Sequence, residues 1–143
     1  MIILFYQLET MTTSTLSKAD KLHTIARNYV IKGLGNKNFD AIPYAENVVL
    51  RAPLSPGGST QPLIGKESLR NQWWAPLPSL LAGVEIVDTY VNKEETGVVV
   101  EFYCRIISPA CTLRVTDRFI VNEEGKIIDQ ENFFDPRPVT NPS

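Results

Sequence analysis

Residues 98–134 read VVVEFYCRIISPACTLRVTDRFIVNEEGKIIDQENFF, and this stretch decides the fold. It contains runs rich in β-branched and aromatic residues at 98–107, 112–121 and 126–134, and a similar run at 84–92 precedes it. Short polar or proline-containing turns separate the runs. Antiparallel strands can be joined by turns this short, whereas parallel strands need long crossovers. The sequence therefore predicts an antiparallel meander in the C-terminal half.

The N-terminal half carries helix signals instead. Ser17 and Asp20 have the spacing of a capping box, and an apolar helical stripe follows at Leu22, Ile25, Ala26, Tyr29 and Gly33. Two shorter helices are expected at 38–42 and 64–73, the second broken at Pro76 and Pro78, with a strand at 47–52 between them. Helices first and a sheet last are typical of an α+β domain.

Length and charge limit the classes of function. The chain has 143 residues, the size of one domain, and we expect an extension at 1–15, the domain at 16–138 and a tail at 139–143. The formal net charge is −2 and no basic run occurs, which argues against nucleic acid as a partner. The apolar opening at 1–6 is too short to cross a bilayer, so no membrane partner is expected.

Few residues of this chain are typical of metal or nucleophilic sites. His23 is the only histidine and no Cys-x-x-Cys pair occurs, so the sequence predicts neither a metal site nor a cofactor. Cys104 and Cys111 are expected to be reduced thiols rather than a disulfide. Reduced cysteines make the cytoplasm the expected location.

Asp117 is the most informative residue. Alternation along its strand places it on one face with Cys111, Leu113, Val115, Phe119 and Val121. A carboxylate on an apolar face is rare unless it is paired, hydrogen-bonded or functional, and burial raises its pKa. Two interpretations stay open with equal weight: a structural carboxylate held by backbone amides or an arginine, and a functional acid.

The last strand has a mixed pattern. One face carries Ile128, Gln130, Asn132 and Phe134, and the other carries Ile127, Asp129, Glu131 and Phe133. Neither face is uniformly apolar, so counting does not settle which one is buried. If the first face turns inward, two amides join Asp117 in lining a cavity; otherwise both amides are solvated.

Three aromatic residues of the predicted helices are further candidates. Tyr29 lies on the apolar stripe, so its hydroxyl needs an internal partner if it is buried. Trp73 and Trp74 fit the wall of an apolar pocket as well as simple core filling. Because neighbouring helical side chains point about 100° apart, we expect one tryptophan to face inward.

Several segments, in this order, resemble the NTF2-like superfamily, in particular its SnoaL-like and ketosteroid-isomerase-like members. The first segment runs from Tyr29-Val30 to the stretch 38–42, and the others are 64–70, 117–127 and 133–135. The resemblance spans roughly residues 18–138. It implies a cystatin-like cone, in which N-terminal helices pack on a curved antiparallel sheet around an open apolar cavity. A small apolar molecule is the implied partner.

The resemblance also implies roles for single residues. In ketosteroid-isomerase-like members a helix tyrosine and a protonated strand aspartate stabilise an oxyanion, and Tyr29 and Asp117 match these two positions. The position of the catalytic base matches Ala52, which has no proton-accepting group. Limonene-epoxide-hydrolase-like members use an aspartate where this chain has Asn132. Tyr29 and Asp117 are thus the catalytic candidates. The ligand-binding candidates are Trp73, Trp74, Phe119, Gln130, Asn132 and Phe134.

Three functions are compatible with these features. The first is a SnoaL-like enzyme of isomerase, cyclase or hydrolase type, in which Asp117 and Tyr29 act as donors. The second is a pocket that binds a small apolar ligand without catalysis. The third is a dimerising domain that pairs through the outer sheet face at Val99, Glu101, Tyr103 and Arg105.

We expect residues 1–10 to be dispensable for folding, because Met11 is a plausible start and the preceding residues match no part of the resemblance. Deleting them should leave the melting temperature nearly unchanged. A fall of many degrees would show that they form an extra arm that packs on the domain.

We expect the protein to be a homodimer. Val99, Tyr103 and Ile107 give the outer face of the sheet an apolar content that a lone domain would expose to water. Light scattering at micromolar concentration should report twice the mass of the chain, and a monomer would contradict the expectation.

Overall fold

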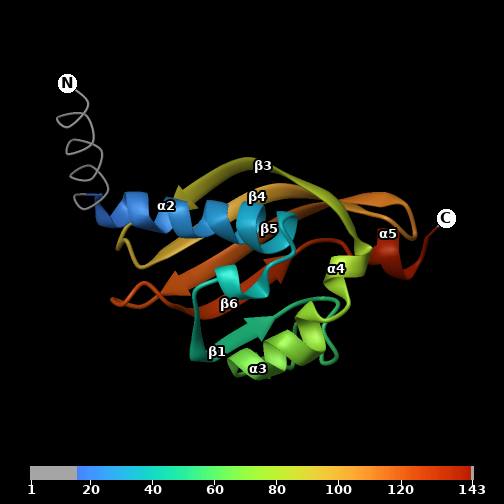
Figure 1. Cartoon of the computed structure of the whole chain (residues 1–143), viewed down its shortest axis with the longest axis horizontal. Helices are drawn as coiled ribbons and strands as arrows, with labels where there is room; N and C mark the ends of the chain where they lie inside the picture. Colours follow the sequence, from blue (N-terminus) through green and yellow to red (C-terminus); the bar gives the residue numbers. More distant parts are fainter. Residues whose placement is uncertain (1–15, 143) are drawn as a thin grey trace.

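Figure 1 shows the computed structural model, which describes residues 16–142. The expected extension at 1–15 lies outside the described residues, and so do the residues on which the predicted deletion of 1–10 and the start at Met11 depend. Within them, helices pack on a curved sheet of six strands (Figure 1). The predicted α+β class is therefore confirmed. No helix among residues 16–142 is long and apolar enough to cross a bilayer.

Ser17 begins the N-terminal helix as its spacing predicts. Its side-chain oxygen accepts a hydrogen bond from the backbone amide of Asp20 at 3.1 Å, and α2 (Lys18–Asn28) follows. The helical path continues as the π-helical segment η1 (Tyr29–Gly35), which ends in the predicted glycine region. The helix packs against β3 and β4 and buries its apolar stripe there.

The predicted meander is present. Its strands are β3 (Leu81–Val91), β4 (Gly97–Ile106), β5 (Cys111–Val121) and β6 (Ile127–Phe133), which pair antiparallel in this order. Their bounds differ from the predicted ones by three residues at most, at the start of β3. Short hairpin turns thus determined the order of neighbours in the sheet.

Two further strands complete the sheet, whose order is β2-β1-β6-β5-β4-β3. β1 (Tyr44–Arg51) pairs with β6 in parallel, and β2 (Leu63–Ile64) pairs with β1 antiparallel. The meander pattern did not predict the parallel pair. It is possible because the chain between β1 and β6 is long enough for a crossover, which contains β2 and the first three strands of the meander.

The remaining helices are short. They are η2 (Phe39–Ala41), α3 (Lys66–Ser68), η3 (Leu69–Trp74), α4 (Leu77–Leu80) and α5 (Arg137–Thr140). The break expected at Pro76 and Pro78 is only partly present, because a new helical turn starts after Pro76. Pro78 lies in the first turn of α4, where a missing N–H costs no hydrogen bond. Helix α5 crosses the expected domain end at 138.

The inward face of β5 follows the predicted alternation. Leu113, Val115, Asp117 and Phe119 are buried, and the end residues of this face are partly buried. On β6, Gln130 and Asn132 are buried, so the two amides face inward. Ile127, from the other predicted face, is buried too. The register between β5 and β6 shifts beside it, which explains why simple alternation fails on this strand.

Gly65 precedes α3 with a φ of 100°, a backbone conformation that side chains with a Cβ rarely adopt. We expect Gly65→Ala to lower the free energy of unfolding by about 1–2 kcal/mol, although a Cβ has space there. Gly83→Ala is the matched control, since a Cβ meets nothing within 4 Å at that position. Urea unfolding measures both, and equal stability of the two variants would contradict this account.

Candidate functional site

The sheet and helices enclose a cavity of about 170 Å³. Most of its wall is apolar and comes from η1, η3, α4, β4, β5 and the C-terminal segment. The exposed and partly exposed lining residues mark its mouth: Leu54, Pro76, Leu77, Leu80, Phe134 and Val139. Tyr29, Ala52 and Asp117 also line it and are each at most 1% exposed, so they mark its inner end.

Asp117 lies at the inner end of this cavity. Its Oδ1 is buried and has no hydrogen-bond partner among residues 16–142. Burial raises the pKa of Asp117 to about 8, and the neighbouring Tyr29 hydroxyl lowers it by a smaller effect. The carboxyl group is therefore mainly protonated at neutral pH. Neither a backbone amide nor an arginine donates to Oδ1 among the described residues.

A buried hydrogen-bond network supports the groups next to Asp117. The hydroxyl of Tyr44 donates to Oε1 of Gln130 at 2.6 Å. Nε2 of Gln130 donates to the hydroxyl oxygen of Tyr29 at 3.1 Å and to Oδ1 of Asn132 at 2.9 Å. The network joins η1, β1 and β6, so it fixes side chains from three elements around the inner end of the cavity.

Tyr29 is the first residue of the π-helical segment, a type of helix that occurs often at functional sites. Its ring packs edge-on against Phe119 at 4.8 Å and Phe102 at 6.4 Å between ring centroids. Burial, with the nearby Asp117, raises the pKa of Tyr29 well above its usual value. The hydroxyl thus stays protonated and can donate a hydrogen bond.

The structure brings most of the predicted site residues together. Tyr29, Trp73, Asp117, Asn132 and Phe134 all line the cavity. Trp74, Phe119 and Gln130 lie outside its lining. Each of these three packs against a lining residue: Trp74 against Trp73, and Phe119 and Gln130 against Tyr29. Their effect on a ligand would act through these neighbours.

Trp73 and Trp74 are both buried, at 6% and 7% exposure. The expectation that one tryptophan faces inward is therefore wrong, because both do, although only Trp73 lines the cavity. Trp74 packs on Phe39 with 5.5 Å between ring centroids and belongs to the core under η2.

The cavity lacks a second carboxyl group among its described lining residues. Ala52, which matches the base position of the isomerase-like members, lines it with a methyl group. Cys104 also lines it, and burial raises the pKa of this thiol to about 11, with a smaller contribution from Asp117. The thiol is therefore protonated and a weak nucleophile. Residues 16–142 contain no cluster of acidic, cysteine or histidine side chains that could hold a metal ion.

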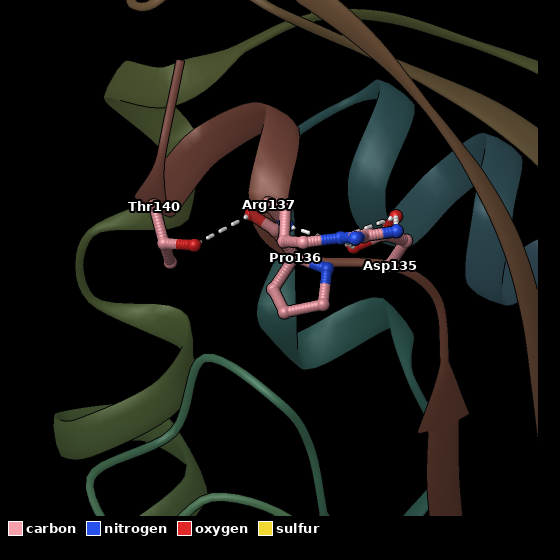
Figure 2. Close-up of polar contacts among 4 residues, drawn as sticks. All are labelled: Asp135, Pro136, Arg137 and Thr140. Carbon is pink, nitrogen blue, oxygen red and sulfur yellow. Dashed lines mark hydrogen bonds and ion pairs between the residues drawn. The ribbon is translucent and has the colours of Figure 1, made fainter. Parts of the chain in front are cut away.

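Figure 2 shows the turn that begins α5. Nε of Arg137 donates to both carboxylate oxygens of Asp135, at 2.9 and 3.0 Å, and Nη2 donates to Oδ2 at 2.7 Å. Hydrogen bonds from Arg137 lower the pKa of Asp135 to about 2. Thr140 donates to the carbonyl oxygen of Pro136 at 3.2 Å (Figure 2). The turn holds Val139 at the mouth of the cavity.

Tyr44 is the site residue that the sequence did not reveal. It is 3% exposed, and burial raises its pKa well above the usual value. The register of β1 against β6 shifts between Tyr44 and Val49, so β1 shows no regular alternation that would mark Tyr44 as inward-facing. The Gln130 side chain that it contacts lies far along the chain.

Comparisons with known proteins identify the fold. No model of a protein family matches the sequence, and neither does any curated protein. Solved structures do match. The epoxide hydrolase/cyclase-like enzyme SalBIII, of pyran ring formation in the polyether salinomycin, superposes with a TM-score of 0.68 at 18% identity, over 80% of this chain and 91% of that chain.

Two further structures are similar. An NTF-2 like protein from Burkholderia xenovorans has a TM-score of 0.64 at 15% identity, over 82% of this chain and 85% of that one. A Mycobacterium tuberculosis protein in complex with estradiol-17beta-hemisuccinate has a TM-score of 0.64 at 14% identity, over 79% of this chain and 93% of that one. The chain therefore has the NTF2-like fold, also called the cystatin-like fold, as its resemblance implied.

Proposed function

We propose that this protein binds a small, largely apolar molecule that carries an oxygen acceptor, and that Asp117 and Tyr29 donate hydrogen bonds to that oxygen. The observation that carries the proposal is a buried carboxyl group that lines an apolar cavity and has one oxygen without a partner among residues 16–142. Burial also raises the pKa of this group to about 8, which favours its protonated, donating form. A buried polar group without a partner costs free energy, and a ligand oxygen at this position would recover that cost.

The size of the cavity limits the ligand. A cavity of about 150 Å³ in another protein holds benzene, and the cavity here is of similar size at about 170 Å³. It accommodates one ring with small substituents, while longer groups would extend past Leu77 and Val139 at the mouth. Among the similar structures, one contains a bound steroid derivative and another is a designed binder of 17-OHP, so this fold can hold apolar ligands.

The chemistry open to the site is that of an acid. A protonated Asp117 and the Tyr29 hydroxyl can polarise a carbonyl or an ether oxygen, which assists water addition or ring opening. Removal of a proton from carbon would need a base, and Ala52 supplies none. We therefore propose ligand binding as the primary function, and acid-assisted isomerase-, cyclase- or hydrolase-type chemistry as the second candidate.

Association through the outer sheet face is compatible with this function. Ile107 and Phe133 are about half exposed, which leaves apolar surface outside the cavity. We propose a homodimer that covers this face, as the third hypothesis requires, with the ligand cavity left open on the opposite side of the sheet.

Asp117 should give the protein an unusual dependence of stability on pH. Its pKa is about 8 in the folded state and near 4 in an unfolded chain. Between these values the folded state binds the extra proton, so the contribution of Asp117 to the free energy of unfolding falls as the pH rises. Asp117→Asn removes this loss. The melting temperature of the variant should exceed that of the wild type increasingly from pH 5 to pH 8.

The comparison with Asp129→Asn on the outer face of β6 controls for the loss of a carboxyl group as such. Comparing each variant with the wild type at each pH cancels the titration of the other groups. If Asp117 were a structural carboxylate, Asp117→Asn would instead destabilise by roughly 1–3 kcal/mol at neutral pH. That result would remove the basis of the proposal.

Ligand binding should depend on a donor at position 117. Asp117→Asn keeps an N–H donor and should retain binding of a small ketone such as acetophenone, measured by calorimetry or by ligand-observed NMR. Asp117→Leu removes the donor and should weaken binding by about tenfold, the equivalent of one hydrogen bond. An acid-catalysed reaction would be lost in both variants. Unchanged affinity in Asp117→Leu would show that the carboxyl does not contact the ligand.

A further inference from the structure

We propose that Gln130 sets the hydrogen-bonding polarity of the cavity, so that the site accepts ligands with a hydrogen-bond acceptor and rejects ligands of equal size that can only donate. The inference rests on the proposed function, because it concerns the same cavity. It assigns to Gln130 a positioning role, since this residue acts on a ligand only through Tyr29 and Asn132.

The amide group of Gln130 is held from both ends. The residue is 0% exposed. Its oxygen accepts from the hydroxyl of Tyr44 at 2.6 Å, and its nitrogen donates to Tyr29 at 3.1 Å and to Asn132 at 2.9 Å. Both N–H groups are thus used, and none of the amide faces the cavity.

These bonds turn one acceptor oxygen of each of the two neighbours that line the cavity toward Gln130. Gln130 occupies the hydroxyl oxygen of Tyr29 and the carbonyl oxygen of Asn132. The hydroxyl hydrogen of Tyr29 is then directed away from Gln130, toward Asp117 and the inner end of the cavity, and the NH₂ group of Asn132 remains for a ligand; both groups are donors. One buried amide therefore orients two lining side chains with the same polarity.

The other polar groups around the inner end agree with this polarity. Asp117 adds an O–H donor while it is protonated. The ionisable groups that face Asp117 are Tyr29 on η1, Tyr44 on β1 and Cys104 on β4, and burial raises the pKa of each, so all three are neutral. No lysine or arginine occurs among the described lining residues. The matching ligand is a neutral molecule with a carbonyl, ether or epoxide oxygen.

A reversed amide would give the opposite site. With Oε1 toward Asn132, the side chain of Asn132 would have to turn its NH₂ group toward Gln130, and the hydroxyl of Tyr29 would donate to Gln130 instead. The cavity would then present acceptors. Gln130→Glu leaves a single donor at nearly constant volume, because a carboxyl group buried at this position is protonated and has one O–H where the amide has two N–H groups.

The test compares acetophenone, which only accepts, with indole, which only donates; the two have the same number of non-hydrogen atoms. Calorimetry or ligand-observed NMR at pH 6 keeps Asp117 protonated in the wild type. The wild type should bind acetophenone at least about tenfold more tightly than indole, as one net hydrogen bond implies. In Gln130→Glu the preference for acetophenone should fall, because only one of the two neighbours still receives a hydrogen bond from residue 130.

Two further variants keep the test independent of one substitution. Tyr44→Phe removes a bond to Gln130 but leaves both of its donors, so the preference for acetophenone should persist. Gln130→Met removes the amide without adding charge, and the ratio of the two affinities should approach one. If Gln130 had only a structural role, its replacement would weaken the binding of both ligands equally and leave the ratio of their affinities unchanged.

The outcomes separate this inference from the proposed function. If the wild type binds neither compound, the proposed function itself fails. If the wild type binds both compounds equally, or prefers indole, ligand binding stands and the role of Gln130 is overturned. An unchanged ratio in folded Gln130→Glu and Gln130→Met, verified by their melting curves, would overturn it as well.

Discussion

The burial of one carboxyl group without a partner for Oδ1 is the constraint on which the site depends. Asp117 lies on the inward face of β5, between Val115 and Phe119, where a charged carboxylate would lose its hydration without compensation. The neutral form is favoured instead, and its pKa rises to about 8. An apolar wall maintains this state, since each water or cation admitted to the cavity would lower the pKa. The apolar lining and the protonated acid are therefore parts of one arrangement.

The buried amide of Gln130 differs from Asp117, because its polar atoms are all hydrogen-bonded to other buried side chains. Gln130 would be costly to bury alone, but Tyr44, Tyr29 and Asn132 use its oxygen and both of its N–H groups. The parallel pairing of β1 with β6 makes this possible, because it brings the start of β1 beside the buried face of β6. The topology that closes the sheet thus also supplies the partner of Gln130.

Regular alternation decided how much of this arrangement the sequence could predict. On β5, apolar residues at every second position place Asp117 on the inward face, and the structure agrees. On β6 the buried residues are Ile127, Gln130 and Asn132, and a register shift separates the first from the other two, so no period of two exists to be read. The sequence could not predict that Tyr44 belongs to the site for a related reason, since the pairing of β1 is irregular and its partner strand is distant in sequence. Local hairpins are visible in a sequence, whereas a parallel crossover and a polar face completed by distant residues are not.

The cavity has several hydrogen-bond donors but lacks a base at the position of Ala52, and this affects which functions it can have. Tyr29, Asn132 and protonated Asp117 offer donors to the same inner end, which suits an oxygen that carries partial negative charge. A reaction that builds such charge by removing a proton also needs an acceptor for the proton, and Ala52 occupies the matching position. Where such donors stabilise a ligand oxygen equally in the ground state and in a transition state, they raise affinity without raising the rate of a chemical step, in agreement with the proposed binding function. Where negative charge develops on that oxygen, the same donors favour the transition state, in agreement with the second candidate, acid-assisted chemistry.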